Sequence, residues 1–321
     1  MAASSRLWWD VPYGPDGTTA PEGSRFLRLH KAPACMPAGE AHGTVCVIHG
    51  GFWKNRYGLD DEYGNAGCWS VAPFFLRRGF SAVEVEYRRR DHEGGGWPGT
   101  NEDVLAALRK LEELHREPQA GSTAVECGDG AFLAAARALR PGRVVLVGHS
   151  AGGCLALWAA HQLVDPGALR VALTLAAAPV ADLVLGHELK ISDEGDAVER
   201  YMGRAPDGEA ALAEYARASP AALLPVRSPL VVAFGGQDAD VPPAAIEGYA
   251  AAAKSQSPDL VAVVQLEDAD HFDVVSARSA AWLEHIAPAL AGLAEAALGV
   301  EAAAALRARY PEEEEEEGRA A

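Results

Sequence analysis

The chain has 321 residues, and its 45 acidic and 28 basic side chains give a net charge of −17. Hydrophobic residues make up 49% of the chain and charged residues 23%, which is ordinary for a globular protein that buries one large core. The excess of negative charge argues against partners such as nucleic acid or an anionic membrane surface.

The cysteines and the terminal segments of the chain are informative about its cellular compartment. Five cysteines are present, no C-x-x-C spacing occurs, and no disulfide framework or zinc site is indicated. The segment Met1–Gly14 lacks the pattern of a signal peptide, and no apolar run is long enough to cross a membrane. We therefore expect a cytoplasmic protein without a metal. The like charges of Glu312–Glu317 predict a disordered acidic tail.

Short runs of apolar and β-branched residues predict strands along most of the chain. These runs are almost continuously apolar and do not alternate with polar residues, which is typical of parallel strands covered on both faces. The predicted strands are Thr44–Ile48, Ala82–Tyr87, Val144–Val147, Val171–Ala176, Leu230–Phe234 and Leu260–Leu266.

Helical patterns alternate with these strands, and this alternation predicts a doubly wound, mostly parallel α/β sheet. The predicted helices are Asn101–Arg116, Ala151–Leu163, Pro242–Lys254 and Ser276–Leu298. The segment Val180–Val226 is too long for a plain crossover and predicts a small helical cap, which includes a helix at Glu209–Arg217. Gln119–Gly130 is rich in small and polar residues and predicts a surface insertion. We expect one α/β domain over residues 1–298, with the cap at about 180–226, followed by a helical appendage and the acidic tail over 299–321.

The segment Gly148-His149-Ser150-Ala151-Gly152 fits the pattern G-x-S-x-G between a predicted strand and a predicted helix. A sharp turn from strand to helix exposes the central serine in a strained conformation, and small neighbours make room for it. The helix N-terminus also favours an anion that forms there. Ser150 is therefore the candidate nucleophile.

A second glycine-containing segment, His49-Gly50-Gly51-Phe52-Trp53, follows the predicted strand Thr44–Ile48. Acyl transfer creates a tetrahedral oxyanion, which is stabilised by backbone amides that already point at it. We expect the amides of Gly51, Phe52 and Ala151 to form this oxyanion hole, and His49 to orient the loop rather than transfer protons.

A serine hydroxyl needs a base, and the base needs a partner that fixes its tautomer. His271 follows the last predicted strand on a short loop, at the sheet edge where Ser150 also lies, and is the candidate base. Asp238 follows the strand Leu230–Phe234 and is the candidate carboxylate. Asp240, two residues further on, is its rival, and Asp238 could instead serve only an Asx turn.

With these residues in place, the chain resembles an α/β-hydrolase of the kynurenine formamidase and carboxylesterase branch, from about Tyr13 to Ile286. His49–Trp53 is similar to the H-G-G-x-W box of the formamidases. Further similarity lies in Glu86-Tyr87-Arg88, in Trp97-Pro98 with Asp103, and in Ser219-Pro220. The chain order of serine, aspartate and histidine is also that of α/β-hydrolases. The resemblance implies the α/β-hydrolase fold and a triad of Ser150, Asp238 and His271.

These observations predict a cofactor-free serine hydrolase that acts on a small-molecule ester or aryl-formamide. Phe52, Trp53, Trp97 and Phe272 are the expected pocket residues, although each could equally be a core aromatic. Two other functions stay open, namely a peptidase or amidase on the same triad and a non-catalytic binding protein on a hydrolase scaffold. The segment Gly94–Gly99 formally fits G-x-G-x-x-G, but Trp97 and Pro98 within it argue against a dinucleotide loop.

Overall fold

The computed structural model describes residues 7–15, 19–20, 23–33, 41–61, 64–117, 129–163 and 169–310. The predicted acidic tail, nearly all of the predicted insertion at 119–130, and two of the five cysteines lie outside these ranges. The other three cysteines, Cys46, Cys68 and Cys154, are buried free thiols. In the described part of the chain, no helix is both long enough and apolar enough to span a membrane.

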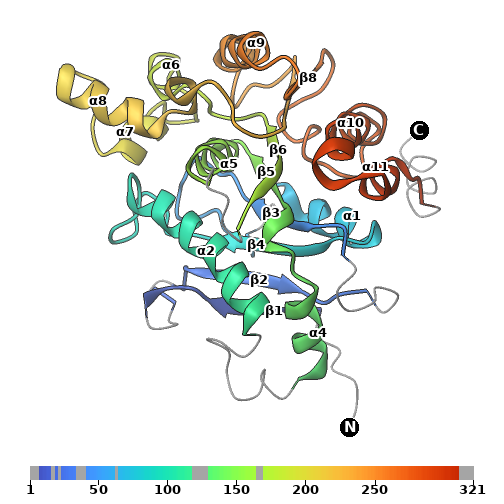
Figure 1. Ribbon diagram of the computed structural model, residues 1–321. Helices are drawn as coiled ribbons and strands as arrows, with labels where there is room; N and C mark the ends of the chain where they lie inside the picture. Colours follow the sequence, from blue (N-terminus) through green and yellow to red (C-terminus); the bar gives the residue numbers. More distant parts are fainter. Residues whose placement is uncertain are drawn as a thin grey trace.

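A twisted sheet of eight strands forms the centre of the described structure, in the order β1-β2-β4-β3-β5-β6-β7-β8 (Figure 1). The strands from β3 onward are parallel, whereas β2 is antiparallel to both β1 and β4. The predicted doubly wound, mostly parallel sheet is therefore confirmed. The strands are β1 (Trp8–Pro12), β2 (Phe26–His30), β3 (Thr44–Ile48), β4 (Ser81–Glu86), β5 (Val144–His149), β6 (Val171–Ala177), β7 (Leu230–Gly235) and β8 (Val261–Leu266).

Helices cover both faces of this sheet. Figure 1 shows α1, α10 and α11 together on one face and α2, α4 and α5 on the other. The helices outside the cap segment are α1 (Val71–Arg77), α2 (Gly99–Arg116), α4 (Gly130–Ala138), α5 (Ala151–Gln162), α9 (Glu247–Gln256), α10 (Ala287–Leu298) and α11 (Val300–Arg307). Because both faces are covered, every residue of the central strands β3, β5 and β6 is buried.

The segment between β6 and β7 contains α6 (Leu183–Glu188), α7 (Ala197–Met202) and α8 (Glu209–Ala218). In Figure 1 this segment, drawn in yellow, projects beyond the sheet at the upper left. It is joined to the rest of the chain by aromatic and polar contacts. Tyr201 stacks on Trp53, and the indole nitrogen of Trp158 donates to the Arg217 carbonyl over 3.0 Å.

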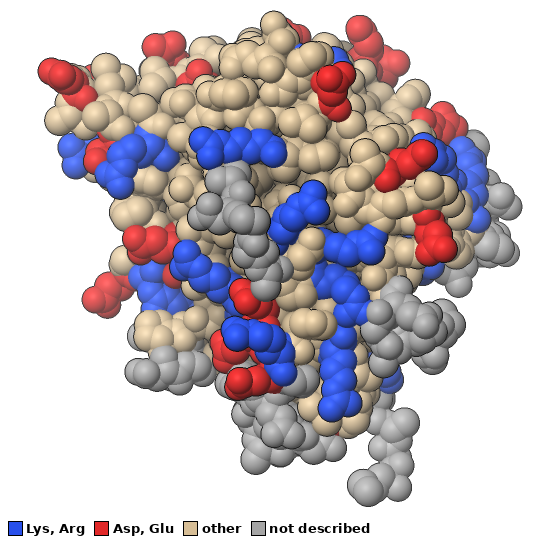
Figure 2. Space-filling view, in the orientation of Figure 1, with Lys and Arg blue, Asp and Glu red and all other residues tan. Residues whose placement is uncertain are grey.

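Charge is not spread evenly over the surface. Figure 2 shows one face on which Lys and Arg side chains gather near the middle, with acidic side chains between and around them. The three consecutive arginines Arg88–Arg90 do not form such a patch, because each pairs internally. Arg88 binds Asp103, Arg89 binds Glu86, and Arg90 lies 3.4 Å from Asp196.

Candidate active site

Ser150 occupies the turn between β5 and α5. Its φ of 57° and ψ of −120° are unusual for a residue with a side chain, and its amide donates to the Ala177 carbonyl over 2.8 Å. Helix α5 begins at the next residue, so the Ser150 side chain lies at the positive end of the helix dipole. The strained turn matches the geometry that the G-x-S-x-G pattern predicts.

Gly152 makes this turn possible by close packing. A Cβ atom on Gly152 would lie 2.1 Å from the Ile48 carbonyl oxygen and 2.4 Å from that of His49. We therefore expect Gly152→Ala to lower the free energy of unfolding by about 2 kcal/mol or more, because backbone atoms must shift. Gly292→Ala on the exposed side of α10 meets no atom within 4 Å and serves as the control. Urea unfolding of both variants measures the difference, and equal stabilities would contradict the packing described.

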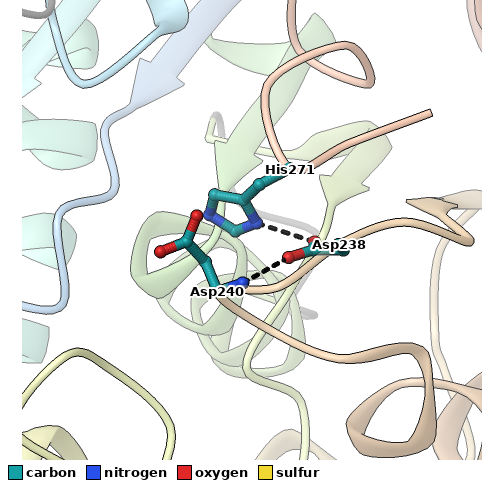
Figure 3. A group of neighbouring side chains, drawn as sticks. All are labelled: Asp238, Asp240 and His271. Atoms are coloured by element: carbon teal, nitrogen blue, oxygen red, sulfur yellow. Dashed lines mark hydrogen bonds and ion pairs between the residues drawn. The ribbon is translucent and has the colours of Figure 1, made fainter.

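The His271 imidazole is paired with Asp238. Its Nδ1 lies 2.7 Å from Asp238 Oδ2, and both side chains are almost completely buried (Figure 3). The other carboxylate oxygen of Asp238 accepts hydrogen bonds from the amides of Asp240 and Val241. The Asp238 side chain thus forms the Asx turn and also contacts the histidine. The rival, Asp240, does not pair with Nδ1.

The loop after β3 lies directly against Ser150. A Cβ atom on Gly50 would lie 2.9 Å from the Ser150 Cβ atom, and Gly51 adopts a φ of 94° that favours glycine. The amides of Gly51, Phe52 and Ala151 donate no hydrogen bond to any other described residue. They are therefore available to an oxygen atom that binds beside Ser150.

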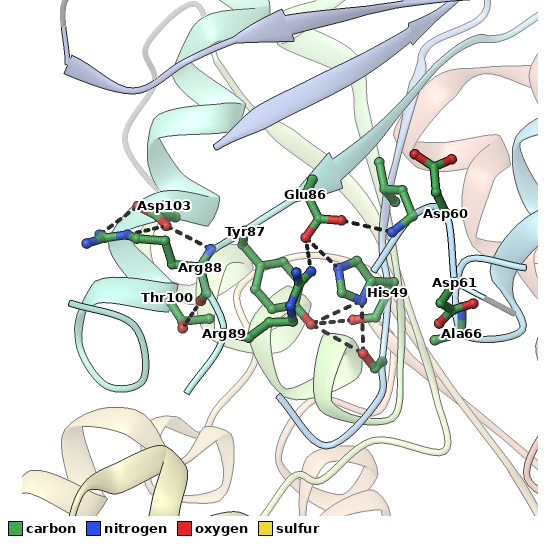
Figure 4. A network of polar contacts seen from close by, with 12 residues as sticks. His49, Asp60, Asp61, Ala66, Glu86, Tyr87, Arg88, Arg89, Thr100 and Asp103 are labelled. Atoms are coloured by element: carbon green, nitrogen blue, oxygen red, sulfur yellow. Dashed lines mark hydrogen bonds and ion pairs between the residues drawn. The ribbon is translucent and has the colours of Figure 1, made fainter. Parts of the chain in front are cut away.

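A buried polar network supports this loop from behind (Figure 4). His49 stacks on Tyr87 at 4.4 Å and its Nε2 lies 3.6 Å from Glu86, while the Tyr87 hydroxyl donates to the His49 carbonyl over 2.8 Å. Burial alone would raise the pKa of Glu86, but His49 and Arg89 together hold that pKa below its ordinary value. The network agrees with the expected role of His49 in orienting the loop.

One pocket of about 200 Å³ opens beside these groups. Its lining residues are Gly51, Phe52, Tyr57, Ala66, His149, Ser150, Asp240, His271 and Phe272. Ser150 and His271 thus line the same cavity. Their side chains do not hydrogen-bond to each other, a contact that in serine enzymes often tightens only when substrate binds.

Two of the four expected pocket residues do not line this cavity. Trp53 is completely buried and stacks on Tyr201 at 4.2 Å, while Trp97 packs against Trp158 and donates to Glu214 over 3.0 Å. Phe52 and Trp53 both have positive φ values, 52° and 56°, and only Phe52 reaches the pocket. The directions of the Phe52, Trp53 and Trp97 side chains depend on the backbone turn at 52–53 and on contacts with the cap. Neither can be read from the amino-acid composition of these segments.

His149 also lies at the site. Its side chain lines the pocket, and its ring centroid lies 4.5 Å from that of His271. Its Nε2 lies 2.9 Å from the His271 carbonyl oxygen, so it holds the loop that carries His271. Burial, aided by His271, lowers the pKa of His149 to about 3.

This low pKa predicts a loss of stability in acid. The folded chain keeps His149 neutral, whereas the unfolded chain protonates it below its ordinary pKa of about 6.5. The free energy of unfolding should therefore fall by about 2 kcal/mol between pH 7 and pH 5 on account of His149 alone. Urea unfolding at both pH values should show that His149→Asn removes this dependence, whereas His285→Asn, which replaces an exposed histidine, keeps it. The same pH dependence in all three proteins would contradict the prediction.

Comparison with known proteins places this geometry in context. The profile of the prolyl oligopeptidase family (Peptidase_S9) matches residues 130–289, a range that contains Ser150, Asp238 and His271. None of the curated proteins is significantly similar in sequence. A bifunctional GH43-CE protein from Bacteroides eggerthii superposes with a TM-score of 0.61 at 17% identity, over 84% of this chain but only 36% of that protein.

Two esterases of similar size also superpose. Esterase B from Lactobacillus rhamnosis gives a TM-score of 0.59 at 19% identity, over 86% of this chain and 81% of the esterase. Esterase 2 from Thermogutta terrifontis, solved with propionate bound, gives 0.56 at 19% identity, over 83% and 85% of the two chains. At sequence identities this low, the similarity concerns the fold alone. The strand order, the strained turn at Ser150 and these superpositions together show that the chain has the α/β-hydrolase fold.

Proposed function

We propose that the protein is a serine hydrolase that cleaves a small carboxylic ester or an aryl-formamide through an acyl-enzyme. The observation that carries this proposal is the pairing of His271 with the buried Asp238, at 2.7 Å, beside a pocket that Ser150 also lines. A serine at a strained strand-to-helix turn, a histidine and a buried carboxylate have the roles required for nucleophilic catalysis.

Each step is assigned to a group of this chain. Ser150 attacks the substrate carbonyl carbon while His271 Nε2 takes the hydroxyl proton, and Asp238 stabilises the imidazolium through Nδ1. The amides of Gly51, Phe52 and Ala151 bind the oxygen of the tetrahedral intermediate. His271 then protonates the leaving group, the acyl group stays on Ser150, and a water molecule activated by His271 releases it.

The size and walls of the pocket favour a small substrate. A volume of about 200 Å³ is less than that of most sites for drug-sized ligands, and Phe52, Tyr57 and Phe272 supply aromatic walls. The structural neighbours named as esterases support an ester. The Thermogutta enzyme was solved with propionate bound and also phosphonylated by sarin.

One kinetic comparison distinguishes an ester substrate from a formamide substrate. We suggest measuring kcat/KM on N-formylkynurenine and on short-chain p-nitrophenyl esters with the same preparation. A preference for the formamide above about 100-fold, or about 2.7 kcal/mol, would assign the formamidase branch, and the reverse preference would assign a carboxylesterase. Hydrolysis of neither would contradict the proposal.

A peptidase or amidase on the same triad is the second candidate, and the match to the prolyl oligopeptidase profile favours it. Cleavage of aminoacyl p-nitroanilides at rates comparable to those of the esters would support it. A non-catalytic binding protein is the third. It would bind ligands in the same pocket but leave all of these substrates intact.

A further inference from the structure

Asp240 is a pocket residue to which the proposed chemistry assigns no role. It lines the same cavity as Ser150 and His271, and it is partly buried. One ligand atom each from Asp238, Asp240 and His271 lies within 4.8 Å of the others. Figure 3 shows the Asp240 carboxylate across the imidazole from Asp238, on the side of the second ring nitrogen. A carboxylate thus lies close to the atoms that would react.

This carboxylate has no partner in the described structure. Its backbone amide donates to Asp238, but no described group donates to its own oxygen atoms. Among the described residues that line the pocket there is no lysine or arginine. Lys54 and Arg56 contact the aromatic walls Phe52 and Tyr57, but both are paired with Asp193. The Asp240 carboxylate therefore faces the cavity without a lysine or arginine of the described pocket lining to neutralise it.

An uncompensated carboxylate next to aromatic walls attracts cations and repels anions. An ammonium group bound there would form charge-assisted hydrogen bonds and satisfy the carboxylate oxygens. The short separation between Asp240 and His271 restricts where that ammonium can sit, because the substrate carbonyl must touch Ser150. An ammonium bound to Asp240 must therefore lie close to the scissile carbonyl, and an amino group on the first or second carbon beyond that carbonyl meets this condition.

We propose that Asp240 selects substrates whose acyl group carries a protonated amine close to the scissile carbonyl, such as esters or amides of short amino acids. This inference rests on the proposed hydrolase function and narrows it to a substrate class. Bound in this way, the substrate places its ammonium against Asp240 and its carbonyl oxygen at the amides of Gly51 and Phe52.

Three p-nitrophenyl esters of matched length test the proposal: the neutral butyrate, the cationic 3-aminopropionate and the anionic hemisuccinate. Low ionic strength keeps screening small, and spontaneous hydrolysis is subtracted. We expect kcat/KM for the cationic ester to exceed that for the anionic ester by at least about tenfold. Asp240→Asn should bring this ratio close to one, chiefly through KM, and Asp240→Glu should restore part of it. Asp268→Asn removes an exposed carboxylate outside the pocket and should keep the wild-type ratio.

Several results would overturn the proposal. One is a wild-type enzyme without preference for the cation. Another is an Asp240→Asn variant that loses the same factor on all three esters, which would mean that Asp240 acts through His271 rather than on the substrate. An equal loss of preference in Asp268→Asn would indicate a general effect of net charge. If wild type hydrolyses none of the esters above the Ser150→Ala background, the hydrolase proposal falls and this inference falls with it. Hydrolysis without charge preference removes only the inference.

Discussion

Ser150→Ala is expected to lower kcat by at least about 10³-fold on any substrate that the protein hydrolyses. The substitution removes the oxygen that forms the acyl-enzyme, but it leaves the His271–Asp238 pair and the loop amides in place. What remains is the stabilisation of charge by the oxyanion hole, which in serine enzymes sustains a slow reaction above the rate in water. Steady-state kinetics on the preferred ester measure the loss.

Stability has to be measured in parallel, because Ser150 lies at a strained turn. Alanine can adopt the same φ and ψ at a cost similar to that for serine, so the melting temperature should change little. Ser279→Ala is a control that removes a serine hydroxyl outside the pocket, one that donates to the Asp273 carbonyl over 3.0 Å. It should retain kcat. Near-wild-type turnover by Ser150→Ala would end the proposal that Ser150 is the nucleophile.

Asp238→Asn should lower kcat by about 10³- to 10⁴-fold. An asparagine can still accept hydrogen bonds from the amides of Asp240 and Val241 through Oδ1, so the loop keeps its shape. Its amide group then faces His271 and favours the tautomer that carries the proton on Nε2. That nitrogen can no longer take the proton of Ser150, and the negative charge that stabilises the imidazolium is also lost.

Asp238 and Asp240 are only two residues apart, so this prediction also discriminates between them. Asp268→Asn again provides a variant with the same change in net charge and should keep the wild-type kcat. A loss of less than about tenfold for Asp238→Asn, with a larger loss for Asp240→Asn, would mean that the rival carboxylate serves His271 during the reaction.

The sequence predicted the parallel part of the sheet because its strands are covered on both faces. The predicted runs from Thr44–Ile48 to Leu260–Leu266 agree with β3 to β8 within one or two residues at each end. The antiparallel strands β1 and β2 were missed, since a charged side chain interrupts the apolar run in each of them. Arg28 in β2 is buried only because Asp10 and Asp60 pair with it, and pairing across the fold does not show in a local pattern.

The site residues also divide into those that the sequence could predict and those that it could not. Ser150, Asp238 and His271 could be proposed because each follows a predicted strand at the same edge of a parallel sheet, and the structure brings the last two into contact. The pocket walls could be predicted only in part, because a wall residue is defined by the direction of its side chain, and of the four expected residues Phe52 and Phe272 line the cavity. Trp53 and Trp97 contact residues of the cap. Ala66 reaches the cavity from a segment without a distinctive pattern, and His149 occupies a variable position of the G-x-S-x-G segment.

Reaction with a fluorophosphonate, followed by peptide mapping with mass spectrometry, is the most direct test of the central claim that Ser150 is an activated nucleophile. We predict one adduct per chain on the peptide that contains Ser150. We also predict no adduct in Ser150→Ala and much slower labelling in Asp238→Asn. A folded wild-type protein that stays unlabelled, or that is labelled only at another residue, would contradict the account.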